Sequence, residues 1–272
     1  MGKLFVVGTP IGNLEDISAR GIKTLEEVDF IAAEDTRVSL KLLSRYGIKK
    51  PMVSYYEHNA RERGEQILQR ILAGENGAVI TDAGMPCISD PGEDLVALCA
   101  ENGVEVVVVP GPSAAISALA ISGLATRRFA FEGFLDPKKN ARKKQLEEIK
   151  EDRHTLIFYE APHKLLATLE DMLAVLGNRK ISLARELTKT FEEVVRTDLQ
   201  GAIEHFTATT PKGEFVLIVE GAAEQRAEIP LEEAVKQVKL LQEEGLSAAE
   251  AAKTISRQTG IKKGDLYKAS LQ

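Results

Sequence analysis

The sequence predicts an α/β fold with two αβ domains, the first built on a mostly parallel sheet and the second on a mixed one, followed by a small helical domain. Short apolar runs alternate with helical patterns from residue 3 to about 123. Such runs are typical of strands buried on both faces of a parallel sheet, and their alternation with helices predicts helices on both sides. A second alternating set follows residue 128, and beyond residue 223 only helical spacing remains.

The first domain is expected over residues 1–115. Its helix at about 90–102 has a start signal, because Asp90 can serve as N-cap, Pro91 can take the first helical position and Glu93 the third. A capping role therefore suffices to explain Asp90. The strands are expected at 3–8, 29–33, 52–55, 77–82 and 104–109, and the other helices at about 16–28, 36–46 and 59–73.

The second domain is expected over residues 116–222. The small apolar residues of 111–123 predict a tightly packed helix that leads into it. A strand at 190–197 makes this half hairpin-like and mixed in strand direction. The other strands are expected near 129–134, 154–160, 180–186 and 213–220, with a helix at about 162–176.

The tail, residues 223–272, is expected to form a small helical domain. Ser247 and Glu250 form a capping box, which predicts a helix start, and Gly260 precedes a last helix at about 263–270. Two short helices joined by a Gly turn resemble a helix-turn-helix. Simple packing against the rest of the chain is at least as consistent with so small a core.

The composition favours a soluble globular protein in a reducing compartment. Apolar residues make up 44% of the chain and charged residues 28%, and no stretch approaches the roughly 20 apolar residues of a membrane span. Cys87 and Cys99 are too few for a disulfide framework, and Cys99 falls on an expected buried helix face. No apolar leader precedes the first strand. We therefore expect a cytoplasmic protein with no membrane partner.

The net charge of −6 argues mildly against a protein that wraps nucleic acid over its whole surface. One local basic patch is present all the same. It is either a solvated helix with lysine–glutamate pairs four residues apart or a phosphate-binding surface. Its members are Lys138, Lys139, Arg142, Lys143 and Lys144.

Three loops rich in Gly, Pro and small polar residues follow expected strands, at 8–13, 81–86 and 110–114. Ligands bind beyond the carboxyl ends of parallel strands, so these loops predict a site for a small polar ligand. The sequence contains no G-x-G-x-x-G fingerprint, P-loop or G-x-S-x-G elbow, which disfavours nicotinamide enzymes, NTPases and serine hydrolases. No metal cluster is expected, because the histidines are scattered: His58, His154, His163 and His205.

The three loops together resemble the tetrapyrrole methylase superfamily of S-adenosylmethionine-dependent enzymes. Further motifs are similar to one branch, the ribosomal small subunit 16S rRNA (cytidine-2′-O)-methyltransferases, and the resemblance covers essentially residues 3–221. These motifs are Glu34-Asp35-Thr36-Arg37, His58-Asn59, Phe158-Tyr159-Glu160-Ala161-Pro162-His163-Lys164, Arg185-Glu186-Leu187-Thr188-Lys189 and Lys212-Gly213-Glu214-Phe215.

The resemblance implies S-adenosyl-L-methionine as cofactor, bound in a cleft between the two αβ domains. Gly and Pro loops bring backbone amides and carbonyls close to such a ligand, and a carboxylate can balance its charge. Without the resemblance, Ser113 is equally consistent with a helix cap and Asp82 with a turn former. The implied cofactor residues are Pro10, Ile11, Thr81, Asp82, Ala83, Gly84, Met85, Ser113, Ala114, Glu160, Leu187, Lys212 and Gly213.

The implied reaction is 2′-O-methylation of a cytidine ribose, at position 1402 of 16S rRNA in the decoding centre. The catalytic base stays open among Glu160, His163, Glu186 and Lys189, of which Lys189 would have to be neutral or stabilise an alkoxide. A target base could stack on Tyr55, Tyr56 or Tyr159, although core roles are equally open. The expected RNA contacts are Arg37, His58, Arg61, Lys138, Lys139, Arg142, Lys143, Lys144 and Arg185.

By the same resemblance, the partners are 16S rRNA or the small ribosomal subunit, and a second copy of the chain in a homodimer. Two alternatives remain open at this point. A methyltransferase of the tetrapyrrole or diphthine type would share the cofactor loops and need a wider acceptor trough. A non-catalytic ribosome-binding factor would bind without transferring a methyl group.

Overall fold

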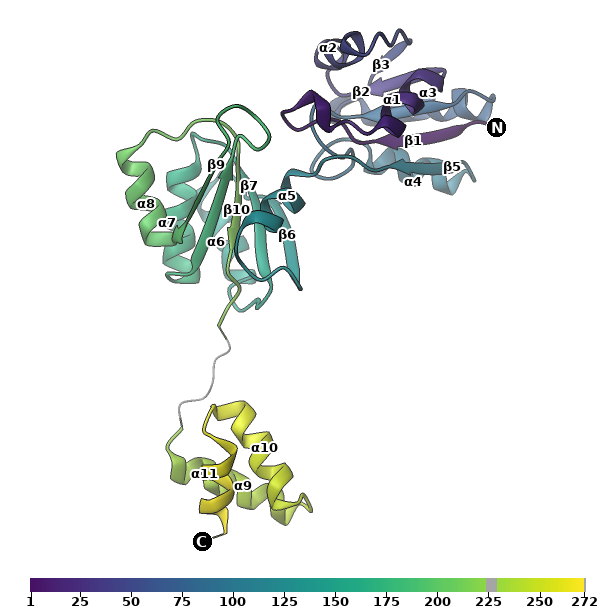
Figure 1. The fold of residues 1–272 in the computed structure, drawn as a ribbon. Helices are drawn as coiled ribbons and strands as arrows, with labels where there is room; N and C mark the ends of the chain where they lie inside the picture. Colours follow the sequence, from purple (N-terminus) through teal and green to yellow (C-terminus); the bar gives the residue numbers. More distant parts are fainter. Residues whose placement is uncertain (224–228, 272) are drawn as a thin grey trace. The chain divides into compact units, whose positions relative to one another are not determined.

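The computed structural model describes residues 1–223 and 229–271, so residues 224–228 and 272 of the predicted tail lie outside the described part. The chain divides into two compact units, Met1–Ala222 and Ala223–Gln272. The first unit holds two five-stranded sheets, one parallel and one mixed, and the second holds helices (Figure 1). This architecture confirms the predicted α/β fold class.

The first sheet is parallel throughout, with strand order β3-β2-β4-β1-β5. Each crossover carries helical structure, as parallel neighbours require. The strands are β1 (Lys3–Val7), β2 (Phe30–Ala33), β3 (Met52–Ser54), β4 (Gly77–Ile80) and β5 (Glu105–Val109). The helices are α1 (Ala19–Glu27), α2 (Thr36–Arg45), α3 (Ala60–Leu72) and α4 (Glu93–Glu101), with short 3₁₀ turns at Leu14–Asp16 and Glu57–Asn59.

The two faces of this sheet bury separate apolar clusters. On one face, Leu4 and Val6 pack with Ile67 of α3 and with Leu95 and Cys99 of α4. On the other face, strand residues of the opposite parity, among them Val7 and Ile31, pack against Leu25 of α1 and Leu43 of α2. The period-two alternation of the strands therefore places helices on both faces, as predicted.

The expectation that every strand is buried on both faces is wrong for β5. This strand pairs only with β1 and so forms an edge of the sheet. Val108 is 55% exposed and Glu105 is exposed as well, while Val109 is buried. An apolar run alone does not separate a central strand from an edge strand.

The second sheet has the order β6-β7-β10-β8-β9, and only the β6–β7 pair is parallel. The predicted mixture of strand directions is confirmed. Its strands are β6 (Phe129–Phe134), β7 (Thr155–Glu160), β8 (Lys180–Arg185), β9 (Glu193–Asp198) and β10 (Phe215–Val219). Its helices are α5 (Ala114–Ile121), α6 (Lys139–Glu148), α7 (Leu165–Leu176) and α8 (Leu199–Ala208), of which α8 was not expected.

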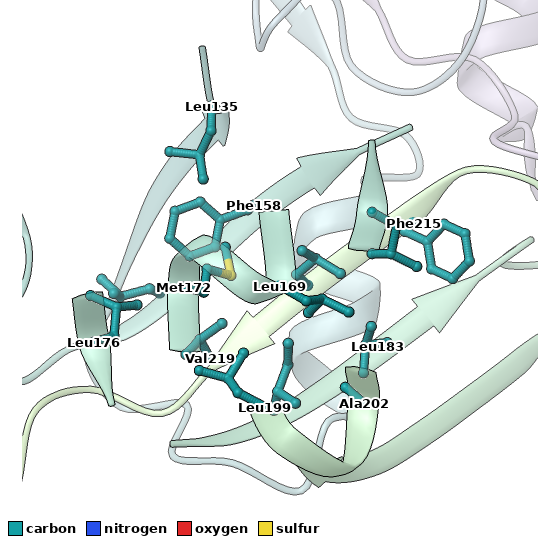
Figure 2. Close-up of a cluster of buried hydrophobic side chains, with 14 of the residues drawn as sticks. Leu135, Phe158, Leu169, Met172, Leu176, Leu183, Leu199, Ala202, Phe215 and Val219 are labelled. Atoms are coloured by element: carbon teal, nitrogen blue, oxygen red, sulfur yellow. The ribbon is translucent and has the colours of Figure 1, made fainter. Parts of the chain in front are cut away.

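Helices α6, α7 and α8 cover one face of this sheet and α5 covers the other (Figure 1). The larger core lies beneath α7 and α8, where Phe158, Leu169 and Met172 are fully buried. Figure 2 shows these side chains gathered between strand and helix. On the opposite face, Ala118 of α5 packs with Ile157 and other strand residues.

The second unit consists of α9 (Leu231–Glu243), α10 (Ala248–Thr259) and α11 (Lys263–Ser270). Its own small core includes Val238, Ile255 and Leu266. The predicted capping box is confirmed, because Ser247 and Glu250 bond reciprocally, and Gly260 ends α10 at a φ of 76°. In the described part of the chain, the helices are too short or too polar to cross a bilayer.

Candidate functional site

The loops that follow β1, β4 and β5 meet at the carboxyl edge of the first sheet. Thr9 and Gly84 exchange backbone hydrogen bonds of 2.9 and 3.1 Å, and the Thr9 hydroxyl donates to the Thr81 carbonyl at 3.0 Å. The Gly111 amide lies 3.3 Å from the Met85 sulfur. These contacts confirm the predicted convergence of the three loops.

Glycine is required where the first and third loops touch. A Cβ added to Gly8 would lie 2.6 Å from the Gly111 Cα, and one added to Gly111 would lie 2.8 Å from the Gly8 carbonyl carbon. Neither backbone can move away without breaking the β1–β5 pairing nearby. The pair therefore fixes how closely the loops approach each other.

The first loop also contacts the segment that follows β8, and this contact joins the two sheets' loops. The Asn13 amide donates to the Thr188 hydroxyl at 3.0 Å. A Cβ on Gly12 would lie 2.7 Å from the Leu187 carbonyl oxygen and 2.6 Å from the Lys189 side chain. We call this contact between Gly12–Asn13 and Leu187–Lys189 the loop seam.

A cavity of about 360 Å³ lies between these loops and the ends of β7, β8 and β10. Eleven of the predicted site residues line it: Ile11, Asp82, Ala83, Gly84, Met85, Ser113, Ala114, Glu160, Glu186, Leu187 and Lys189. Eleven further residues complete its wall: Glu34, Ile88, Ser89, Asp90, Phe134, Tyr159, Ala161, Ala184, Glu214, Phe215 and Val216.

Several predicted site residues lie beside the cavity instead of lining it. Thr81 is buried and donates to Glu34 at 2.6 Å. Lys212 is exposed and contributes its carbonyl to Arg185. A Cβ on Gly213 would lie 2.5 Å from the Glu186 side chain, so the glycine makes room for that carboxylate. His163 is exposed and does not line the cavity. Pro10 is buried and does not line it either.

The four candidate bases differ in the hydrogen bonds and ion pairs that they already form. Glu160 is 4% exposed, and its two oxygens accept from the Ala161 amide at 2.8 Å and the Thr168 hydroxyl at 2.5 Å. Glu186 pairs with Lys189 at 3.0 Å, which lowers the pKa of Glu186. The pKa of Lys189 is raised by Glu186 and Glu214 despite its partial burial. A raised pKa disfavours a neutral Lys189, and stabilisation of an alkoxide stays open for this residue.

The opposite wall carries three carboxylates from the first sheet's loops. Burial, followed by the negative charge of Glu34, raises the pKa of Asp82. The same two causes, in the same order, raise the pKa of Asp90 to about 6, while the Thr81 hydroxyl beside it acts in the opposite direction. This wall therefore holds negative charge at a cost in folding free energy.

The prediction that Asp90 caps α4 is wrong. The helix begins at Glu93 with Gly92 as N-cap, at a φ of 137°, and receives no side-chain cap. A Cβ on Gly92 would lie 2.6 Å from the Cys87 sulfur, so the N-cap position has no room for a side chain. The Asp90 carboxylate lines the cavity instead. Ser113 does hold the N-cap position of α5, without a side-chain bond.

Backbone strain gathers around the cavity. Of the described residues, the non-glycines with positive φ are Cys87 (72°), Ser89 (62°), Glu186 (51°) and Thr188 (63°). Ser89 and Glu186 line the cavity, and the other two are their near neighbours in the chain. Such conformations persist only where the surroundings enforce them, and they are concentrated at functional sites.

Aromatic side chains form one end of the cavity. Tyr159 lies edge to face with Phe131, at 5.1 Å between ring centroids, and 5.4 Å from Phe134, which is 57% exposed. The Tyr159 hydroxyl accepts from the Ala115 amide at 3.3 Å.

Tyr55 is 1% exposed in the first sheet's core, so its predicted stacking role is wrong. Tyr56 is exposed.

The predicted RNA contacts lie outside the cavity and differ in availability. Arg37 has a side chain 88% exposed and pairs with Asp35 at 2.6 Å. His58 and Arg61 border a shallow hollow at the start of α3. Arg185 forms an ion pair with Glu193. Lys138, Lys139 and Lys144 are exposed.

Arg142 corrects the interpretation of the basic patch. Its side chain is 6% exposed and pairs with the equally buried Asp171 of α7 at 2.6 Å, while Lys143 lies 3.6 Å from the same carboxylate. A guanidinium held this way cannot reach an RNA phosphate. Arg142 instead fastens α6 to α7, and the predicted RNA contact at this residue is wrong.

Three further lining residues lie next to strand ends, a position that can be predicted from the sequence. Glu34 directly follows β2, Phe134 ends β6 and Glu214 precedes β10. The rule that carboxyl ends of parallel strands face the ligand applies to Glu34 as well as to the three Gly-rich loops. Among the described residues, no group of three or more His, Cys, Asp or Glu side chains is placed to hold a metal ion.

The chain belongs to the tetrapyrrole (corrin/porphyrin) methylases, because the model of that family matches residues 3–203. A relative from Synechocystis sp., named ribosomal RNA small subunit methyltransferase I, is 46% identical over 100% of this chain and 98% of its own length. A relative of the same name from Thermotoga maritima is 48% identical over 221 residues, which are 81% of this chain and 99% of the relative. Uroporphyrin III C-methyltransferase from Thermus thermophilus, solved with S-adenosylhomocysteine, has the same fold (TM-score 0.57, 18% identity, 80% of this chain and 97% of that one).

We expect Asp90→Asn to stabilise the protein at neutral pH. The raised pKa means that the folded state holds this proton more tightly than the unfolded state, so stability falls as pH rises from about 4 to about 6 and stays lower above. Asparagine does not ionise and so avoids that loss. The free energy of unfolding should rise by about 1 kcal/mol after solvent screening, and the unfolding temperature by roughly 2–4 °C. Thermal unfolding at pH 7.5 and at pH 4.5 measures it. The gain should shrink at pH 4.5, and a substitution of the exposed Glu101 at the end of α4, Glu101→Gln, is the control. Destabilisation by Asp90→Asn at pH 7.5 contradicts the assignment.

Proposed function

We propose that this chain transfers a methyl group from S-adenosyl-L-methionine to the 2′-oxygen of a cytidine ribose in 16S rRNA, at position 1402. Two relatives above 45% identity, one of them matched over nearly its whole length and this entire chain, are named for small-subunit rRNA methylation. The observation that carries the proposal is the acidic cavity at the carboxyl edge of the first sheet. A cationic methyl donor fits that cavity, and an RNA phosphate does not.

The charge of the described lining residues selects the ligand. Six carboxylates face one ammonium group, that of Lys189. The methyl donor carries a positive sulfonium and a positive α-amino group, so an acidic wall attracts it. The backbone phosphates of RNA are repelled, so only a nucleoside can enter. The carboxylates are those of Glu34, Asp82, Asp90, Glu160, Glu186 and Glu214.

We assign cofactor contacts to the lining residues of the three loops. Gly84, at a φ of 90°, exposes its backbone to the cavity without a Cβ. Asp82 and Ser113 supply an acceptor and a hydroxyl on either side of it. Leu187 and Phe215 give the apolar surface that a purine ring requires. When bound, the cofactor would supply an electrophilic methyl group for the ribose oxygen.

We propose Asp90 as the group that takes the proton of the 2′-hydroxyl. Glu160 is fully engaged by hydrogen bonds, Glu186 is held ionised by Lys189, and His163 lies outside the wall. Asp90 is partly buried, faces the cavity and has a pKa of about 6. That value leaves it ionised at neutral pH and yet more basic than an ordinary carboxylate, which suits a general base.

Methyl transfer to RNA tests the proposed function. Purified protein, labelled cofactor and either naked 16S rRNA or isolated small subunits should give a label that nuclease digestion recovers as 2′-O-methylcytidine. A parallel reaction with a porphyrinoid precursor serves as control, since a tetrapyrrole methylase would label only that acceptor. Cofactor binding without label in any acceptor would instead support a binding factor and contradict the proposal.

The pH profile tests Asp90. Since kcat/KM reports the free enzyme, it should rise with pH through about 6, and the limb of kcat should lie lower because a bound cation favours the ionised carboxylate. Asp90→Asn should lower kcat by on the order of 10²–10⁴-fold and flatten this limb, while Asp90→Glu retains part of it. Glu101→Gln should leave the profile unchanged. An unaltered limb in Asp90→Asn removes this residue as the base.

We further propose that the chain acts as a homodimer in the cytoplasm, where small subunits are found. An apolar edge strand supports the dimer: Val108 on β5 is 55% exposed and Ile116 on α5 is 51% exposed, and exposed edges of this kind are usually covered. Sedimentation velocity should give twice the 29.7 kDa chain mass, and Val108→Glu should shift it toward the monomer. A monomeric wild-type protein contradicts this assembly.

A further inference from the structure

The C-terminal unit separates its basic and acidic side chains between different helices. The segment 247–271, which contains α10 and α11, has five basic and two acidic side chains, and one of the acidic ones, Glu250, is engaged by Ser247. Helix α9 has the opposite balance, with four acidic and two basic residues within 231–244. We call the exposed basic residues of α10 and α11 the basic surface: Lys253, Arg257, Lys262, Lys263 and Lys268.

The centre of the basic surface lies at the turn between α10 and α11, which contact each other. Lys262 is the N-cap of α11 and Lys263 its first residue. Cations at that end face the positive pole of the helix and are unfavourable there. Among the described residues, no carboxylate forms an ion pair with Arg257, Lys262 or Lys263. This charge therefore does little for the stability of the unit and is available to an anionic partner.

The rest of the chain offers RNA fewer of the expected cationic contacts than its sequence predicts. The whole protein has a net charge of −6, its cavity repels phosphate, and Arg142 and Arg185 are engaged by carboxylates. The Thermotoga relative matches over 221 residues, which are 99% of its own length and 81% of this chain, and the Met1–Ala222 unit is of about that size. A protein of that name is thus shorter than this chain by about the size of the C-terminal unit, which fits a role of that unit in binding and not in the chemical step.

We propose that the C-terminal unit is an RNA-backbone-binding module, which uses the basic surface to hold the rRNA whose ribose is methylated. This inference rests on the proposed function for the identity of the RNA. Lysines and arginine on short helices form contacts with phosphates that are independent of sequence and that release counterions. A second contact within one chain strengthens capture of the substrate without touching the reacting atoms.

The test compares two double variants of the full-length protein with the same change in charge. Lys262→Gln/Lys263→Gln removes two charges from the basic surface, and Lys236→Gln/Lys239→Gln removes two exposed charges from α9. The first variant should raise KM for 16S rRNA on the order of tenfold at 0.15 M salt and reduce the slope of log affinity against log salt by about 1.4. Its kcat and cofactor affinity should stay as in wild type, and Lys262→Arg/Lys263→Arg should restore KM.

Unchanged KM and salt slope in the Lys262/Lys263 variant would overturn the proposal, and so would equal losses in the α9 variant. A fall in kcat or in unfolding temperature at unchanged KM would assign these lysines a structural role and overturn it as well. Fluorescence anisotropy with labelled 16S rRNA fragments measures binding without any methyl transfer. If wild-type protein transfers no methyl group, the proposed function fails, while the anisotropy of the two variants still decides the role of the basic surface.

Discussion

The loop seam is the contact on which the candidate site depends. The first sheet supplies Gly12 and Asn13, the segment after β8 supplies Leu187 and Thr188, and the two backbones approach so closely that no side chain fits at Gly12. Both sheets contribute residues to one cavity because this contact holds their loops together. The left-handed backbone at Glu186 and Thr188 is the local strain that accompanies so tight an approach.

Charge organises what the seam encloses. Burial of Asp82 and Asp90 beside Glu34 raises both pKa values, and Lys189 balances only the wall formed by Glu186 and Glu214. A protein that folds around unbalanced carboxylates loses folding free energy, which a cationic ligand restores on binding. The site therefore exchanges stability for affinity, a balance that local structure alone does not require.

The sequence was most informative where one physical signal had one meaning. Apolar period and turn residues located the strands, and the Gly-rich loops located the cavity, because the carboxyl ends of parallel strands meet at one edge. It failed where one pattern served two structures. Asp90-Pro91-Gly92 is typical of a helix start, yet α4 begins at Glu93 with Gly92 as its N-cap and without a side-chain cap. The exposed position of Val108 and the burial of Arg142 against Asp171 depend on neighbours far along the chain. No periodicity records such neighbours.

The acidity of the cavity also sets a direction for turnover. Methyl transfer converts the sulfonium into a neutral thioether, so the spent donor loses part of the attraction that drew its precursor in. Fresh donor keeps both of its positive charges and competes with an advantage for the same carboxylates. The wall formed by Glu34, Asp82 and Asp90 would thus attract the cationic donor more strongly than the neutral thioether product.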